Sequence, residues 1–262
     1  MTTPETTVAI PGELAGRIAL VTGAARNIGR AIAVALAQGG ADVAVHTRAA
    51  RADAEETARQ ITALGRRAIV LTGDLADPAQ ADGAVALAVE ALGGLDIVVN
   101  NAALRREGEI LTIDYAAWRE IMGVTLDAAF LMTRAAMPHI IVRAGHGGGR
   151  IINIGGMTGH SGAHERVHVV TAKAGIVGFT KALACDLARY AITANCVVPG
   201  MIDTVRGGSN PAKAAHHADR KIPLGRRGQP EEVAGMVRYL CGPTAAFVTG
   251  QAIHVNGGTY MP

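Results

Sequence analysis

The residues with the clearest chemical meaning in this sequence form a glycine-bearing turn between Thr22 and Gly29. An apolar run, Ile18 to Val21, precedes the turn, and a largely apolar stretch, Ile28 to Ala37, follows it. This pattern predicts a buried strand, a tight turn and a helix. Backbone N–H groups at the N-terminus of such a helix bind anions, because the helix dipole favours negative charge there. We therefore expect the turn to hold a pyrophosphate, the alternative being an ordinary connection between strand and helix.

A second pattern, His164-Glu-Arg-Val-His168, matches the His-Glu-x-x-His motif of zinc enzymes. On a helix the two imidazoles would share one face, and Glu165 would act as the base. The match falls where a loop is predicted to meet a helix, and the sequence offers no obvious third ligand. We therefore predict no metal site.

The elements that must position these residues alternate regularly along the chain. Strands are predicted over 18–21, 43–47, 68–72, 95–99, 151–154, 192–198 and 252–255, and helices over 28–37, 53–64, 78–92, 115–137, 167–190 and 230–240, with Pro138 ending the helix before it. Such alternation implies a parallel sheet covered by helices on both faces. We predict a single doubly wound α/β domain over residues 14–262, preceded by a flexible tail over residues 1–13.

Composition narrows the function classes. With 262 residues, of which 49% are hydrophobic, the chain is long enough to bury one large core. A net charge of +3 gives no reason to expect nucleic-acid binding. The 3 cysteines are widely spaced and odd in number, which suits a reducing compartment, so we expect a cytoplasmic protein. No apolar run is long enough to span a membrane, and the N-terminus lacks the pattern of a secretion signal.

Several motifs occur in a fixed order between Leu14 and Gly258. They are Thr22-Gly-Ala-Ala-Arg-Asn-Ile-Gly29, Asp74-Leu75, Asn100-Asn-Ala-Ala103, Lys173-Ala-Gly175, Pro199-Gly-Met-Ile-Asp-Thr204 and Gly257-Gly258. In this set and order the chain resembles the short-chain dehydrogenase/reductase family. The resemblance implies a Rossmann-like, seven-stranded parallel sheet and a nicotinamide cofactor, NAD or NADP.

By this resemblance, the cofactor-binding residues gather where the strands end, which is where ligands bind in such sheets. They are Gly23, Arg26, Asn27, Ile28, Gly29, Arg48, Asp74, Leu75, Asn101, Ala102, Lys173, Pro199, Gly200, Ile202 and Thr204. Two positions differ from the family pattern, because Asn27 and Ala103 each stand where a glycine is usual. Asn tolerates unusual backbone angles, so we expect Asn27 to preserve the turn.

The end of the second predicted strand, His46-Thr-Arg48, favours NADP(H). An NAD-specific member of the family would carry an acidic residue there to bind the ribose 2′-OH. No carboxylate is present to repel a 2′-phosphate, and Arg26 and Arg48 offer charge-assisted donors to it. The alternative is that either arginine is an ordinary solvated side chain. We predict NADP(H) as the cofactor.

The reaction chemistry departs from the family pattern. The resemblance implies a Tyr that donates the proton, a Lys that lowers its pKa and holds the ribose, a Ser that holds the carbonyl, and an Asn on the preceding helix. Lys173 is present, but Val169, Gly156 and Thr125 occupy the Tyr, Ser and Asn positions. Because neither Val nor Gly donates a proton, the half of the site that serves hydride transfer is predicted to be intact and the acid/base half to be replaced.

Polar residues in the neighbouring loop are candidate replacements: Thr158, His160, Ser161 and His164. Histidine is a suitable general acid near neutral pH, so we assign catalytic roles to His164, Thr158 and Lys173. His168 lies about 140° around a helix from Lys173 and is expected to point away from the nicotinamide. The alternative is a loop whose polar side chains face water.

Residues 203–227 resemble the family's substrate lid. Its cationic and imidazole side chains are Arg206, Lys213, His216, His217, Arg220 and Lys221, and Arg105 and Arg106 follow the fourth strand. This charge favours an anionic small-molecule substrate. The alternative is a solvated loop.

Three functions remain open at this point. The first is an NADP(H)-dependent oxidoreductase acting on a carbonyl, an imine or an activated double bond with a non-standard proton relay. The second is a redox-inactive cofactor-binding sensor or scaffold, and the third is a non-redox enzyme that reuses the pocket. The sequence names neither the substrate nor the direction of reaction.

The sequence also predicts assembly into a homotetramer, or failing that a dimer. The helix over 167–190 carries small residues on more than one face, and the segment over 247–262 is apolar although it should form a sheet edge. The resembled family is commonly tetrameric through these elements. The alternative is that these residues pack only within one subunit.

Overall fold

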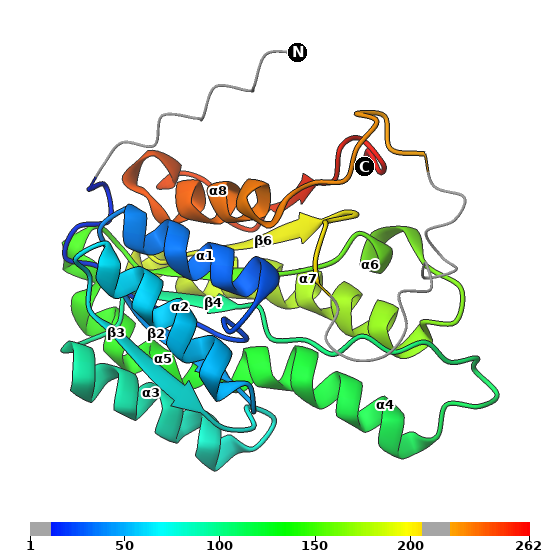
Figure 1. Cartoon of the computed structure of the whole chain (residues 1–262), viewed down its shortest axis with the longest axis horizontal. Coiled ribbons are helices and arrows are strands. Elements are labelled where there is room, and N and C mark those ends of the chain that lie inside the picture. The colour runs from blue at the N-terminus through cyan, green and yellow to red at the C-terminus, as the bar shows by residue number, and fades with distance from the viewer. Residues whose placement is uncertain (1–11, 206–220) are drawn as a thin grey trace.

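A computed structural model of the chain describes residues 12–205 and 221–262 (Figure 1). The strands are β1 (Ile18–Val21), β2 (Asp42–Thr47), β3 (Ala68–Thr72), β4 (Ile97–Asn100), β5 (Arg150–Ile154), β6 (Thr193–Pro199) and β7 (Ala252–Val255). The helices are α1 (Asn27–Gln38), α2 (Arg51–Ala63), α3 (Pro78–Leu92), α4 (Tyr115–Met122), α5 (Ala128–Arg143), α6 (Thr158–Ser161), α7 (Val167–Leu187) and α8 (Pro230–Cys241). Shorter turns are the π-helical η1 (Gly123–Asp127) and the 3-10 turns η2 (Ala144–His146), η3 (Ala188–Tyr190) and η5 (Pro243–Ala245).

The strands form one 7-stranded sheet in the order β3-β2-β1-β4-β5-β6-β7, and every pairing is parallel. The strand order reverses between β1 and β4, which is where ligands bind in sheets of this kind. The predicted fold class, a single doubly wound α/β domain with seven parallel strands, is confirmed.

Helices cover both faces of the sheet (Figure 1). Alternate residues of β1 and β2 enter two separate cores because side chains in a strand point to opposite faces. Val21 and Val45 pack with α1, α2 and α8, whereas Leu20 packs with α3 and α5. Burial on both faces explains why the central strands are almost entirely apolar.

The helix predicted over 115–137 is wrong in two respects. It is interrupted by the π-helical turn η1, and its second part, α5, continues through Pro138 to Arg143. Proline costs a helix about 3 kcal/mol, but α5 buries Ala136 and Ile140 completely against the sheet and α3, and this burial outweighs the cost. A π-helical turn inserts an extra residue, and such turns are frequent at functional sites.

Helix α7 with η3, Val167–Tyr190, has the length and apolar composition of a membrane-crossing helix. In the structure, one side of α7 packs on the sheet and buries Ile176, Thr180 and Ala184. We therefore interpret α7 as a core helix of the domain.

Candidate functional site

A cleft lies over the carboxyl ends of the first four strands. It has a volume of about 140 Å³, and its walls come from the β1, β2, β3 and β4 ends and from η1 and α5. Its lining residues are Gly23, His46, Arg48, Gly73, Asp74, Leu75, Ala76, Ala102, Ala103, Leu104, Val124 and Ala128. Five of the predicted cofactor-binding residues thus meet in one cleft: Gly23, Arg48, Asp74, Leu75 and Ala102.

The turn after β1 is shaped by glycine at two positions. Gly23 adopts φ +62°, a left-handed conformation that other residues rarely take. A Cβ atom on Gly29 would lie 2.2 Å from the Gly23 carbonyl oxygen and 2.6 Å from Asn101 Nδ2, which excludes any side chain. The first turn of α1 therefore packs directly against the turn after β1.

Side chains from the end of β4 hold this turn in place. The Asn101 amide donates to the carbonyl oxygens of Thr22 at 2.9 Å and Gly23 at 3.0 Å. The Thr22 hydroxyl accepts from the backbone N–H groups of Asn101 at 2.9 Å and Ala102 at 3.0 Å. These bonds join two chain segments that lie far apart in the sequence, and they fix the strand ends on which a cofactor would rest.

The N-terminus of α1 fits a bound pyrophosphate. The residue that caps the helix, Arg26, makes no side-chain capping bond, and the first turn contains no acidic residue. Its N–H groups are thus left for another acceptor, and an anion is the acceptor that the helix dipole favours. Ile28, the second residue of α1, is buried in the core.

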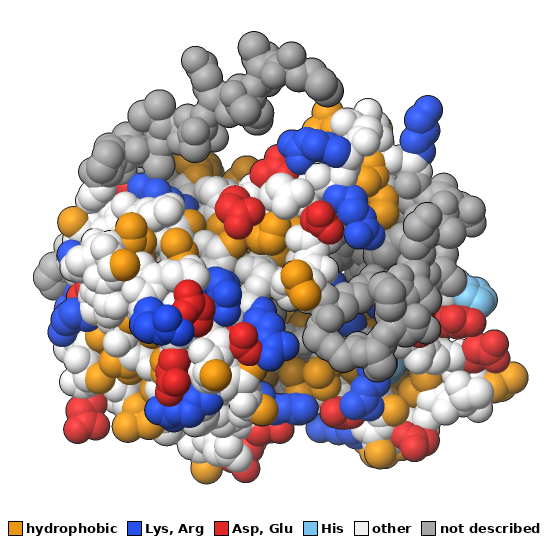
Figure 2. All heavy atoms as spheres, in the orientation of Figure 1, with side chains coloured by type: hydrophobic (Ala, Val, Ile, Leu, Met, Phe, Trp, Pro, Cys, Tyr) orange, Lys and Arg blue, Asp and Glu red, His pale blue; other side chains and the backbone are white. Residues whose placement is uncertain are grey.

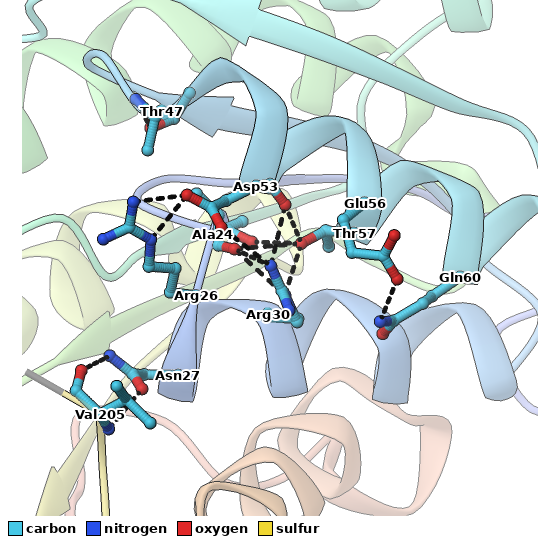
Figure 3. Close-up of polar contacts among 12 residues, drawn as sticks. Ala24, Arg26, Asn27, Arg30, Thr47, Asp53, Glu56, Thr57, Gln60 and Val205 are labelled. Carbon is cyan, nitrogen blue, oxygen red and sulfur yellow. Dashed lines mark hydrogen bonds and ion pairs between the residues drawn. The ribbon is translucent and has the colours of Figure 1, made fainter. Parts of the chain in front are cut away.

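Asn27 also forms a contact that the sequence did not predict. It adopts φ +51°, so it does preserve the left-handed turn. Its amide donates to the Val205 carbonyl at 2.9 Å and accepts from the Val205 N–H at 3.0 Å (Figure 3). A glycine at this position has no amide to offer, so Asn27 links the turn after β1 to the segment after β6.

The arginines predicted to bind a 2′-phosphate lie at the mouth of the cleft, each beside a carboxylate. Arg26 binds Asp53 of α2 through Nε at 2.7 Å and Nη2 at 2.5 Å (Figure 3). Arg48 Nη1 lies 3.9 Å from Asp74 Oδ2. Figure 2 shows the same intermixing of basic and acidic side chains over the face that carries α1 and α2. Sequence reasoning missed Asp53, because it lies one element beyond the strand end where an acid was sought.

His46 closes the floor of this cleft. Its Nε2 lies 3.1 Å from the Gly73 carbonyl oxygen, and its Nδ1 accepts a long bond, 3.5 Å, from the Gly23 N–H. This pattern fits the neutral imidazole with the proton on Nε2. Burial lowers the pKa of His46, in agreement with the neutral form.

The predicted cofactor residues after β6 lie farther along the same edge of the sheet. Gly200 is required there, because a Cβ atom would lie 2.6 Å from Asn256 Cβ. Ile202 pairs with Gly228 in an isolated parallel bridge, and Thr204 is half-buried. Pro199 is the last residue of β6. None of these residues lines the cleft over β1 to β4.

Lys173 lies at the carboxyl end of β5, projecting from α7. Its ammonium donates to the Ile154 carbonyl at 2.7 Å. A Cβ atom on Gly156 would lie 3.5 Å from Lys173 Cγ, so the lysine stem lies over that glycine. Burial, with a smaller contribution from the Arg105 charge, lowers the pKa of Lys173 to about 8.

Two other positions of the predicted acid/base site, 169 and 125, are buried, and so is the neighbouring His168. Val169 is 4% exposed and packs with Ile121 and Ala172. Thr125 lies in the π-helical turn, and its hydroxyl has no hydrogen-bond partner among the described residues. His168 is 1% exposed, and its Nδ1 likewise lacks a partner in the described part of the chain.

The two residues predicted to replace the proton donor lie in different surroundings, His164 in solvent and Thr158 near Lys173. The His164 side chain is 82% exposed, and its Nδ1 lies 3.6 Å from Glu165 Oε1. Thr158 begins α6, where Gly159 packs closely against the Lys173 backbone. No hydrogen bond joins Lys173 to His164 or Thr158 in the described ranges. His160 instead packs on His254, with ring centroids 4.6 Å apart.

The zinc-like motif does not form the geometry that it needs. His164 precedes α7, which begins at Val167, so the two histidines are not on one helix. Within residues 12–205 and 221–262, no group of three or more His, Cys, Asp or Glu side chains is placed to hold a metal ion. The lid residues Arg206, Lys213, His216, His217 and Arg220 lie outside the described residues.

Comparison with known proteins identifies the family. A family model described as enoyl-(acyl carrier protein) reductase matches residues 23–260. The chain belongs to the short-chain dehydrogenase/reductase family. It is 35% identical to the 3-oxoacyl-(acyl-carrier-protein) reductase FabG of Vibrio cholerae over 95% of this chain and 99% of the relative. It is 37% identical to an L-rhamnose 1-dehydrogenase (NAD(P)(+)) of a Sphingomonas species, covering 95% of this chain and 98% of that one. A crystal structure of a short-chain dehydrogenase from Burkholderia cenocepacia in complex with NADP superposes with a TM-score of 0.87 at 36% identity, covering 94% of this chain and 99% of the other.

Proposed function

We propose that this protein is an NADP(H)-dependent oxidoreductase that acts on a carbonyl, an imine or an activated double bond. The observation that carries the proposal is the placement of the glycine turn of β1 and of Lys173 along one edge of a parallel sheet. The glycine turn fits a pyrophosphate, and Lys173 places a cation farther along the same edge. Family membership and the NADP-bound relative support the same reading.

The residues that would hold the cofactor follow from the geometry of this edge. The N–H groups around Asn27 and Ile28 would bind the pyrophosphate, and Arg26 and Arg48 would bind the 2′-phosphate. Asp74 and Leu75 line the cleft in which the remainder of the nucleotide would lie. When bound, NADP(H) supplies or accepts the hydride.

The proton relay would differ from that of the family. Val169 and Gly156 carry no ionisable group, and both lie beside Lys173. The His164 side chain points into solvent, whereas Thr158 lies on the short helix that packs against Lys173, so Lys173 and Thr158 are the better-placed candidates. The proximity of Arg105 to the amine supports a substrate that carries negative charge.

Measurement of cofactor binding and turnover tests this function. We expect NADPH to bind more tightly than NADH, and a panel of carbonyl, imine and enone substrates, anionic ones included, to oxidise NADPH at a rate followed by its absorbance. Tighter NADH binding would contradict the cofactor assignment. NADPH binding without turnover on any member of the panel would favour the sensor or scaffold, and turnover of a substrate without NADPH consumption would favour a non-redox enzyme.

We further propose a homotetramer of cytoplasmic subunits, with residues 1–13 as a flexible tail and residues 203–227 as a substrate lid. Only 33% of the apolar stretch within α7 and η3 is buried within the subunit, which leaves a face for another copy. Phe247, near the C-terminal strand, is fully exposed. Light scattering at micromolar concentration tests the assembly, and a mass near the 26.9 kDa of one chain would contradict it.

A further inference from the structure

The ammonium group of Lys173 has more N–H donors than hydrogen-bond acceptors among the described residues. An ammonium carries three N–H groups. Among the described residues its only hydrogen-bond acceptor is the Ile154 carbonyl, at 2.7 Å. The residue is half-buried at the sheet edge, and with one acceptor among the described residues its other N–H groups are left for a ligand.

The side chains that flank this amine supply no proton. Gly156 lies against the lysine stem: a Cβ atom added at this glycine would lie 3.5 Å from Lys173 Cγ and 3.7 Å from Lys173 Cδ. Val169, one helical turn before Lys173, is buried in an apolar cluster with Ile121 and Ala172. On α6, which packs against Lys173, the titratable residue is His160, and its ring contacts His254 instead.

The surroundings of the amine bring its pKa toward neutral pH. Burial is the main cause that lowers the pKa of Lys173 to about 8, and the Arg105 guanidinium adds to it. Burial raises the pKa of the nearby Cys196 thiol to about 11, so that thiol stays neutral. A general acid works best when its pKa lies near the operating pH.

We propose that the Lys173 ammonium is itself the proton donor of the reduction, and that the neutral amine is the acceptor in the reverse direction. This inference rests on the proposed oxidoreductase function. In the reduction of a carbonyl, a hydride from the reduced nicotinamide bonds to carbon and the carbonyl π electrons move to oxygen. One N–H bond of Lys173 breaks as the O–H bond forms, and the neutral amine then regains a proton from water.

The protonation of Lys173 is measured first, in the protein without substrate. Acetylation with acetic anhydride at a series of pH values, followed by peptide mass spectrometry, reports the neutral fraction of each lysine. Labelling of Lys173 should rise through a midpoint near pH 8. Lys181, exposed on the same helix, serves as the internal reference for reagent concentration. A Lys173 midpoint above pH 10 would overturn the proposal.

Three variants then separate proton transfer from cofactor binding. Lys173→Arg keeps a positive charge but does not release a proton at ordinary pH, so NADPH affinity should change less than about threefold while kcat falls about 100-fold or more. Lys173→Ala should lose turnover and regain part of it with added ethylamine. Lys181→Arg, the matched control, should leave both quantities unchanged.

The outcomes for the two proposals are distinct. Wild-type kcat/KM for reduction should be constant below pH 8 and fall above it, because the ammonium is the reactive form. Wild-type turnover together with an equally active Lys173→Arg variant would refute the role of Lys173 and leave the oxidoreductase function standing. An absence of NADPH oxidation by the wild type would refute the function itself. Trapping of a substrate adduct on Lys173 by borohydride would show a covalent imine in place of simple proton donation.

Discussion

The two ends of the candidate site differ in how far close packing fixes their geometry. Around β1 and β4 the geometry is set by the backbone. A Cβ on Gly29 would lie 2.2 Å from the Gly23 carbonyl oxygen, and the Asn101 amide donates to the carbonyl oxygens of Thr22 and Gly23. Around β5 and α7 the geometry leaves choices open, because Gly156 has ordinary contacts and the Thr125 hydroxyl has no partner among the described residues. Cofactor binding therefore tolerates little change, whereas the reacting groups can change while the fold persists.

The largest effect should come from Gly29→Ala, which tests the closely packed part of the site around β1 and β4. The new methyl group would overlap the Gly23 carbonyl, displacing the first turn of α1 and the N–H groups that would bind the pyrophosphate. We expect NADPH affinity to fall about 100-fold or more and stability to fall by about 1–3 kcal/mol. Gly83→Ala in α3, where a Cβ meets nothing within 4 Å, is the control and should leave binding unchanged. Near-normal NADPH affinity in Gly29→Ala would show that the turn is not the binding site.

The part of the site around β5 and α7 is tested by Val169→Tyr combined with Gly156→Ser. A serine fits at 156, and a tyrosine one turn before Lys173 would place a phenol that can donate a proton. We expect ketone reductase activity to appear or to rise about 10- to 100-fold, because a positioned general acid contributes this much or more. Val169→Phe with Gly156→Ser matches the change in size without the hydroxyl and should show no gain. Equal activity of the two double variants would mean that size alone, and not the new acid, had altered the pocket.

The cofactor preference is tested at Arg26, which Asp53 holds at the mouth of the cleft. Arg26→Ala should weaken NADPH binding about tenfold and leave NADH binding unchanged, since a hydrogen bond between charged groups contributes about 1.5–3 kcal/mol. Asp53→Asn should preserve or improve NADPH affinity, because Arg26 loses its competing partner. Arg51→Ala, which removes an exposed pair with Glu55 on the same helix, is the control. Equal weakening of NADPH and NADH would place Arg26 away from the 2′-phosphate.

The smallest effect concerns the pH dependence of thermal stability that arises from His46 in the cleft. Burial lowers the pKa of His46, so the neutral form stabilises the fold above the ordinary value of 6.5, and this contribution is lost as the pH falls below it. Protonation would also remove the acceptor for the Gly23 N–H. We expect the Tm of the wild type to drop by about 2–4 °C more than that of His46→Asn between pH 7.5 and 5.5. His160, His168 and His254 are present in both proteins, so parallel Tm curves would rule out a contribution from His46.

Much of the fold could be predicted because it depends on local periodicity. Apolar runs that alternate with helical stretches predict the strands and most of the helices, and the parallel order follows from their alternation. The helix over 115–137 could not be predicted correctly, because the burial of α5 against α3 decides that Pro138 remains helical. Local propensity is the weaker term when a whole helix face is buried.

For the candidate site, the amino-acid sequence by itself determined the glycine turn, the end of β2 without a carboxylate, and the absence of Tyr at 169 and Ser at 156, because these are properties of single positions. Only the tertiary structure decided that Asp53 pairs with Arg26 and that Asn27 binds Val205. It also decided that His164 is exposed while Lys173 is half-buried with a lowered pKa. The physical reason is that these features depend on distances and burial between segments far apart in the chain, which sequence periodicity does not specify.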